Sequence, residues 1–174
     1  LLYHTYNNTS NIPQNYTVGL IATNDFGCTD TMEQDLVVYP QVVASFEVQT
    51  SGCQPLEVEF ENTSSNAGQH LWNFGDGSAS SDLNPSHIYY NNSVSQDTSF
   101  TAILSVASEF GCHSTFSRDI RVFPKPKSHF EVENSPGCAP LPVDFLNLSQ
   151  GALVSNWFYG DGSSANDSNM LSNQ

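Results

Sequence analysis

Apolar and polar residues alternate along several short segments of this chain. Leu56, Val58 and Phe60 alternate with glutamates, and the segments 16–22 and 100–106 show the same period of two. Such alternation is typical of strands with one buried face. Gly, Pro, Asn and Ser interrupt the chain about every ten residues, and no long window has helical spacing. The pattern therefore predicts an all-β chain with almost no helix, built from antiparallel sandwiches of about seven strands each.

The sequence repeats itself with a period of about 84 residues. "DFGCTDT" at 25–31 recurs as "EFGCHST" at 109–115, and Trp72 recurs as Trp157, 85 positions later. A fixed period is the signature of a repeat architecture. It predicts the C-terminal part of one unit at 1–40, a complete unit at 41–124 and the N-terminal part of another at 125–174, with Pro124-Lys125-Pro126 as a stiff joint.

The two partial units are complementary, because the first lacks the front of a sandwich and the last lacks the back. A half-sandwich cannot bury its core alone. Either the chain continues at both ends, or neighbouring chains complete each other. Continuation is the simpler account, and it treats the sequence as an excerpt.

A Trp-x-x-Gly-Asp-Gly motif occupies 72–77 and again 157–162. Trp can fill the space between two sheets, Asp can cap backbone amides, and Gly permits a positive φ. His87-x-Tyr89 and the apolar strand at 100–106 follow the first copy. Together these features resemble the polycystin-type (PKD) repeat of large bacterial cell-surface and secreted proteins. The resemblance implies tandem immunoglobulin-like sandwiches that serve as spacers, adhesion modules or binding accessories.

The composition is strongly acidic, with a net charge of −14 and only four basic residues, all between Arg118 and Lys127. Nucleic-acid binding needs many Lys or Arg contacts, and an anionic membrane would repel such a chain, so both partners are excluded. No apolar run approaches the roughly 20 residues of a membrane span, and no signal-peptide pattern opens the sequence. We expect an extracellular segment, secreted or attached to a cell surface.

Four cysteines in an Asn- and Thr-rich repeat chain favour an oxidising compartment and disulfides over metal binding. Cys28 and Cys112 follow the penultimate strand of their units, whereas Cys53 and Cys138 lie between the first two strands. In a seven-strand sandwich these loops lie at opposite ends, about 26 Å apart, and a disulfide spans at most about 7 Å between Cα atoms. This favours bonds between successive units, with partners outside the sequence. A bond from Cys53 to Cys112 stays open as the alternative.

Few residues suggest chemistry. Asp76 and Asp82 lie six positions apart, as do Asp161 and Asp167, so a calcium site in each Gly-Asp-Gly loop is an alternative to ordinary turn capping. The loops lack the remaining ligands of an EF-hand, and capping is the favoured interpretation. No histidine belongs to an evident nucleophile–base pair, so we expect no enzyme, no catalytic residue and no cofactor. The histidines are His4, His70, His87, His113 and His129.

Seven Asn-x-Ser/Thr sequons indicate exposed loops. They begin at Asn7, Asn8, Asn15, Asn62, Asn91, Asn147 and Asn166. The expected function is a structural or adhesive repeat segment of an extracellular stalk or filament, with neighbouring repeats as partners. The alternative is a module accessory to a secreted enzyme or adhesin, which binds a surface glycan or protein through Tyr89, Tyr90, Phe158 and Tyr159.

Overall fold

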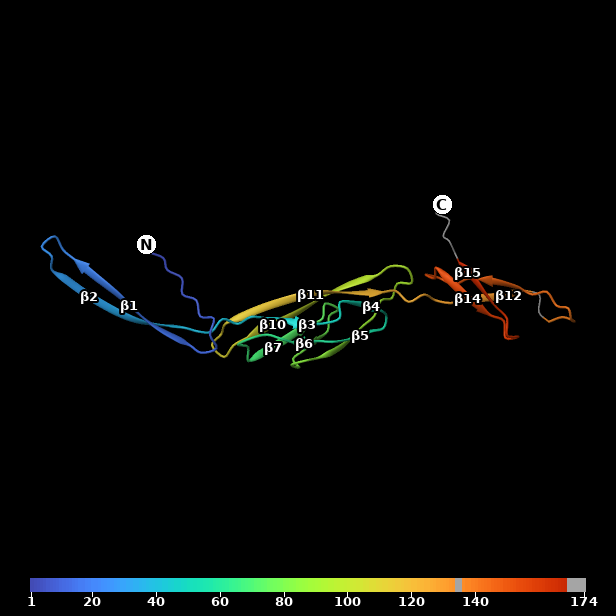
Figure 1. Cartoon of the computed structure of the whole chain (residues 1–174), viewed down its shortest axis with the longest axis horizontal. Helices are drawn as coiled ribbons and strands as arrows, with labels where there is room; N and C mark the ends of the chain where they lie inside the picture. Colours follow the sequence, from blue (N-terminus) through green and yellow to red (C-terminus); the bar gives the residue numbers. More distant parts are fainter. Residues whose placement is uncertain (134–135, 169–174) are drawn as a thin grey trace. The chain divides into compact units, whose positions relative to one another are not determined.

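The computed structural model describes residues 1–133 and 136–168, and Figure 1 shows the course of the chain. These residues form strands and no helix, which confirms the all-β prediction. No described helix is therefore available to cross a membrane. The strands are β1 (Gln14–Thr23), β2 (Thr29–Val38), β3 (Phe46–Glu47), β4 (Ser51–Cys53), β5 (Leu56–Glu59), β6 (Glu61–Asn62), β7 (Gln69–Asn73), β8 (Ala79–Ser80), β9 (Ser86–Tyr89), β10 (Thr98–Ala107), β11 (His113–Phe123), β12 (Phe130–Glu133), β13 (Asp144–Asn147), β14 (Val154–Phe158) and β15 (Ser164–Ser168).

The central strands form a five-stranded sheet, β4-β11-β10-β7-β8, and two strand pairs, β3-β6 and β5-β9. The central part of the chain has nine strands, β3 to β11, whereas the sequence predicts about seven. The difference arises because two strands are interrupted. The first interruption separates β3, which pairs with β6, from β4, which pairs with β11 in parallel. The second separates β5, which pairs with β9, from β6, which pairs with β3. A first strand that changes sheets in this way is a common device of β-sandwiches.

The chain divides into two compact units. The first contains Leu1–Val48, Val58–His87 and Thr101–Arg118, and the second contains Gln49–Glu57, Ile88–Phe100 and Asp119–Gln174. These units do not test the predicted boundaries at 40 and 124, which stay predictions.

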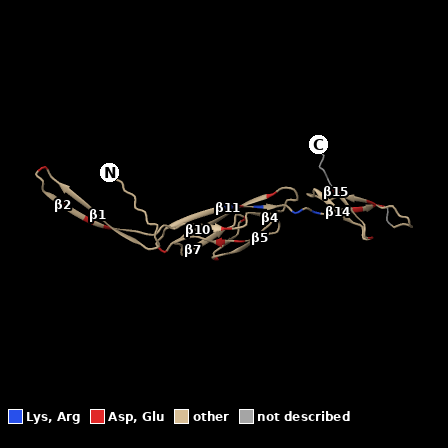
Figure 2. Ribbon diagram, in the orientation of Figure 1, with Lys and Arg blue, Asp and Glu red and all other residues tan. Residues whose placement is uncertain are grey.

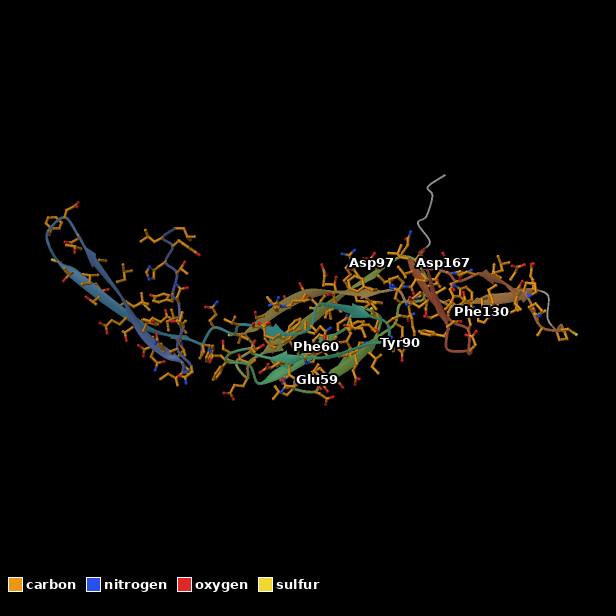
Figure 3. All side chains as sticks on the ribbon, turned by 45° about the vertical axis from the view of Figure 1, so that its right-hand side comes forward. Glu59, Phe60, Tyr90, Asp97, Phe130 and Asp167 are labelled. Carbon is orange, nitrogen blue, oxygen red and sulfur yellow. The ribbon has the colours of Figure 1, made fainter. Side chains whose placement is uncertain are left out.

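Three aromatic rings form the core of the first unit. Phe46, Phe60 and Trp72 are at most 1% exposed, and their ring centroids lie 5.0–5.8 Å apart. Phe60 is labelled among the central strands in Figure 3. The Trp72 indole Nε1 donates a hydrogen bond to the Asp82 carbonyl oxygen at 2.9 Å, so its one polar group is satisfied. Each buried ring stabilises the fold by about 2–3 kcal/mol.

The core of the second unit is aliphatic and aromatic, with one polar exception. Leu56, Tyr89, Ile120 and Val122 are buried, and Asn91 is only 1% exposed. The Asn91 amide Nδ2 donates to the carbonyl oxygens of Gln96 and Val122, both at 2.8 Å. This asparagine therefore ties the loop before β10 to the end of β11.

Local structures recur with the sequence period. The β1-β2 hairpin has the same connecting turn as the neighbouring strands β10 and β11, with equivalent backbone hydrogen bonds and with Gly27 and Gly111 both at φ near 80°. Asn8 is buried like Asn91, and its Nδ2 donates to the Ile12 and Val38 carbonyl oxygens at 2.8 Å.

The pairings near the C-terminus repeat those of the central sandwich as well. Phe130 pairs with Asn147 as Phe46 pairs with Asn62, and Trp157 pairs with Ala165 as Trp72 pairs with Ser80. The repeat is therefore visible in the local backbone structure.

The expectation that every sequon lies in an exposed loop is wrong for Asn15, Asn62, Asn147 and Asn166, which lie in strands, and for Asn8 and Asn91, which are buried. Both side chains are buried because they hydrogen-bond backbone carbonyls at the end of a hairpin. A sequence motif for glycosylation does not distinguish such a structural asparagine from an exposed one.

The contacts of Asn91 lead to the first prediction. Replacing Asn91→Ala removes three hydrogen bonds, two donated by Nδ2 and one that Oδ1 accepts from the Ser93 backbone N–H. It also leaves the buried Val122 carbonyl oxygen without this donor, so the free energy of unfolding should fall by about 2–3 kcal/mol. Urea unfolding followed by tryptophan fluorescence measures the change. Asn92→Ala, at the exposed neighbouring position, is the matched control and should change it by less than about 0.5 kcal/mol. Equal effects of the two variants would contradict the assignment.

Candidate functional site

The strongest polar cluster of the central sandwich lies in the Gly-Asp-Gly turn between β7 and β8. The Asp76 Oδ1 accepts hydrogen bonds from the Ser78 backbone N–H at 3.0 Å and from the Ser78 hydroxyl. Gly75 has φ 84°, and a Cβ there would lie 2.5 Å from the Thr101 carbonyl oxygen, so only glycine fits against β10. The motif therefore builds a capped turn that lies tightly against the neighbouring strand.

His87 of β9 completes the cluster. Its Nε2 lies 2.7 Å from Asp76 Oδ2 and 3.3 Å from the Ser78 hydroxyl oxygen. The imidazole stacks on the Phe74 ring, with centroids 4.2 Å apart and planes 2° from parallel. The stacking orients the imidazole so that its Nε2 contacts the Asp76 carboxylate.

The Asp76 carboxyl group is more acidic than an ordinary aspartate. Partial burial raises its pKa, but the Ser78 hydroxyl, His87 and the Ser78 amide together outweigh that effect and lower the pKa from 3.8 to about 2. The carboxylate is therefore charged over the whole physiological pH range, and it holds the turn against β9.

The three side chains do not have the geometry of a nucleophile and its base. In a catalytic triad the serine and the carboxylate approach different nitrogens of the imidazole. Here Ser78 and Asp76 both approach Nε2, and the Ser78 hydroxyl donates to the carboxylate. The arrangement is that of a turn cap.

Sequence reasoning missed this trio. The Asp-x-Ser spacing of 76–78 recurs at 161–163 and signals a capped turn. Nothing in the sequence shows that His87, eleven positions after Asp76, joins the turn through the β9 strand.

Three of the four acidic residues considered for calcium, Asp76, Asp82 and Asp161, make hydrogen bonds typical of turn capping. The Asp82 carboxylate accepts a hydrogen bond from the Ser80 hydroxyl at 3.1 Å, whereas Asp76 contacts Ser78 and His87. Asp161 is capped like Asp76, and hydrogen bonds from the Ser163 hydroxyl and amide lower its pKa. Among the described residues, no group of three or more His, Cys, Asp or Glu could hold a metal ion.

A family model described as "PKD domain" matches residues 37–122. Residues 37–122 form a PKD domain. The recognised resemblance is thereby confirmed for the central part of the chain. The Asp76–His87 cluster and the aromatic core around Trp72 both lie inside this PKD domain.

Solved structures similar to part of this chain were also found. They include the PKD1 domain of the Vibrio cholerae metalloprotease PrtV, at 29% identity over 47% of this chain and 96% of that chain, with a TM-score of 0.39. The PKD1 domain of Vibrio anguillarum Epp has 29% identity over 49% and 96% of the two chains, with a TM-score of 0.40. Carbohydrate-binding modules of the β-sandwich superfamily have 18% identity over 53% and 43%, with a TM-score of 0.41. No curated protein matches the chain.

No disulfide joins any two of the four cysteines, Cys28, Cys53, Cys112 and Cys138. In the PKD domain, Cys53 pairs with Phe123 at the end of β11, and Cys112 directly precedes His113 at its start. A strand of eleven residues separates the two cysteines by about 33 Å, which rules out the alternative bond between Cys53 and Cys112. Bonds between successive units stay a prediction, because their partners lie outside the sequence.

The four aromatic residues expected to bind a ligand differ in how exposed they are. Tyr89 is 0% exposed and packs against Phe100, so its prediction as a surface residue is wrong. The alternation of β9 points Tyr89 inward. Tyr90, Phe158 and Tyr159 are exposed as predicted.

Basic and acidic residues are unevenly spread. Figure 2 shows the few Lys and Arg along β11 and the segment that follows it, while Asp and Glu are scattered over many strands. Arg118 lies 3.6 Å from Glu47, and Arg121 forms an ion pair with Asp97. Two of the four basic residues are thus paired with carboxylates of the PKD domain itself.

The low pKa of Asp76 leads to the second prediction. Because the folded pKa is below 3.8, the carboxylate stabilises the fold above that pH, and the contribution is lost as the pH falls towards 2. Asp76→Asn should therefore lower the free energy of unfolding by about 1 kcal/mol at pH 7, with allowance for solvent screening.

Urea unfolding at pH 7, 4 and 2.5 tests this prediction. The difference between the native chain and Asp76→Asn should shrink as the pH falls. A difference that stays constant with pH would show that the carboxylate charge is not what stabilises the turn.

Proposed function

We propose that this chain is a structural segment of an extracellular surface protein, in which successive PKD-type units follow one another through fixed joints. Such a segment acts as a spacer in a stalk or filament and holds an adhesive or catalytic part away from the cell. The observation that carries the proposal is that the same joint is built twice, once within each compact unit.

The first joint connects residues 1–40 to the front of the PKD domain. The Asn66 amide Nδ2 donates to the Gln41 carbonyl oxygen at 2.8 Å and approaches the Ser10 carbonyl oxygen at 3.4 Å. Tyr39 stacks on Phe110 with ring centroids 4.5 Å apart and planes 8° from parallel. A bridge between Val43 and Ser65 lies beside these contacts.

The second joint has its contacts at the corresponding positions one period later. A bridge between Lys127 and Gln150 replaces the one between Val43 and Ser65. Gly151 takes the place of Asn66, and both have a positive φ, 74° and 57°. A Cβ on Gly151 would lie 1.8 Å from the Val94 carbonyl oxygen, and Val94 corresponds to Ser10. The two backbones are in direct contact where the first joint uses an asparagine side chain.

Repeated joints support a spacer, because a solenoid-like array needs each repeat to contact its neighbour in the same way. A flexible linker would show unrelated contacts at the two sites. The net charge of −14 supports an extended surface location as well, since like-charged chains stay soluble and apart.

A module that binds a glycan or a protein is the second candidate, and one observation favours it. Phe158 is 84% exposed and corresponds to the exposed Asn73 of the PKD domain, so it faces solvent even in a complete sandwich. Glycan-array binding that is lost in Phe158→Ser would support this role, and absence of binding by the native chain would oppose it.

The contact at Gly151 leads to the third prediction. Gly151→Ala strains a positive φ and drives a methyl group into the Val94 carbonyl oxygen, so the second joint should open more often. Trypsin cleavage after Lys127 reports this opening, because Lys127 is bridged to Gln150 and the bond after Lys125 is protected by Pro126. We expect cleavage to be faster by about tenfold, which corresponds to a destabilisation of about 1.4 kcal/mol.

Gly162→Ala is the matched control. Gly162 has φ 92° but has open space around its Cβ position, so this variant carries the same backbone strain away from the joint. Equal cleavage rates for the two variants would contradict a packed joint.

A further inference from the structure

The chain offers only four positions to a protease that cuts after Lys or Arg, and all four lie between Arg118 and Lys127. Figure 2 shows these residues along β11 and the segment that follows it. Such a protease holds the basic side chain in an acidic pocket and hydrolyses the peptide bond after it. Several residues around that bond must first leave the fold, so a cut follows local opening. The surroundings of each bond therefore decide where the folded chain is cut.

The two arginines lie in β11, which is an interior strand of the five-stranded sheet. Arg121 pairs with Ser51 of β4, and β10 lies on the other side of the strand. The Arg121 N–H donates to the Thr50 carbonyl oxygen at 2.8 Å, and the next residue, Val122, is fully buried. Arg118 lies three positions earlier in the same strand. Cleavage after either arginine therefore requires the sheet of the PKD domain to open.

The two lysines lie outside the strands but differ in the residue that follows them. Lys125 precedes Pro126, which has no N–H and a fixed φ, so this bond fits a protease active site poorly. Lys127 precedes Ser128, and its side chain is exposed between β11 and β12. Lys127–Ser128 is therefore the one bond after a basic residue that lies outside the sheets and does not involve a proline.

The same position is exposed where the following sandwich is complete. Val43 lies one period before Lys127, and both residues form an isolated bridge. Val43 is 45% exposed although it directly precedes the strands of the central sandwich. The next residue, Ala44, is buried, and its N–H donates to the Ser114 hydroxyl oxygen at 3.1 Å. A side chain at this position thus faces solvent while the fold holds the bond after it.

We propose that Lys127–Ser128 is a processing site, the one bond at which a protease specific for Lys or Arg cuts the folded chain. The hydroxyl of a water molecule adds to the Lys127 carbonyl carbon and its proton to the Ser128 nitrogen, which leaves a carboxylate and an ammonium group. The cut leaves the PKD domain at 37–122 intact and separates it from residues 128–174.

The bridge to Gln150 slows this cut. The Lys127 N–H donates to the Gln150 carbonyl oxygen at 2.9 Å, and the Gln150 N–H donates to the Lys127 carbonyl oxygen at 2.8 Å. Both hydrogen bonds must break before the bond enters an active site. The inference goes beyond the spacer role, since it concerns cleavage of the chain and does not depend on what the segment supports.

Limited digestion of the full chain with trypsin under native conditions tests the proposal. We expect the fragments 1–127 and 128–174, identified by intact mass spectrometry, before any cut after Arg118 or Arg121. The chain unfolded in urea is the reference, in which cuts after Arg121 and Lys127 should proceed at similar rates. In the folded chain the cut after Lys127 should be faster than the cut after Arg121 by about a hundredfold or more.

Variants at three positions separate the site from its neighbours. Lys127→Gln should leave the folded chain uncut over the same period, whereas the matched control Lys125→Gln should be cut like the native chain. Gln150→Pro removes the N–H that donates to Lys127 and should speed the cut by about tenfold, while Gln150→Ala keeps this N–H and should not.

The proposal is overturned if the folded chain is first cut after Arg118 or Arg121, or is not cut at all. Equal cleavage of Lys127→Gln and the native chain would overturn it as well. Equal rates for Gln150→Pro and Gln150→Ala would overturn the role of the bridge.

Discussion

Burial of aromatic rings between two β-layers is the interaction on which this structure depends. Phe46, Phe60 and Trp72 are buried in the PKD domain because strands from both the early and the late part of residues 41–124 surround them. The corresponding rings at Phe130 and Phe145 keep the same mutual contacts but stay exposed, because the described residues supply one side of that core only. The ring cluster is therefore a local property of the repeat, while its burial requires a second set of strands.

The polar features of the domain serve that packing. Asp76, Ser78 and His87 close the turn that follows the Trp72 strand, and the Trp72 indole is satisfied by the backbone of the next loop. Asn91 satisfies a buried carbonyl at the far end of β11. The backbone and the neighbouring strands position each of these polar side chains. The Asp76 cluster has the geometry of a turn cap.

Much of this fold could be predicted from the sequence, because alternation and the 84-residue period are local signals. The strands, the Trp-x-x-Gly-Asp-Gly turn and the PKD resemblance follow from them. The partners of Asp76 and Asn91 could not be predicted, since His87 and Val122 reach them through strand pairing between segments distant in sequence. Tyr89 and Asn91 were expected on the surface because a residue type or a sequon does not show which way a strand faces at a given position.

The same limit applies to the joints between units. The Pro-Lys-Pro segment suggested stiffness, but the contacts of Asn66 with Gln41 and of Gly151 with Val94 involve loops that only the folded chain brings together. Whether these joints hold successive units end to end is the central claim. Small-angle X-ray scattering of the full chain, extrapolated to infinite dilution, tests it most directly. The account predicts a folded, elongated particle with a radius of gyration well above the about 16 Å of a compact globule of 174 residues. A value near 16 Å would contradict it.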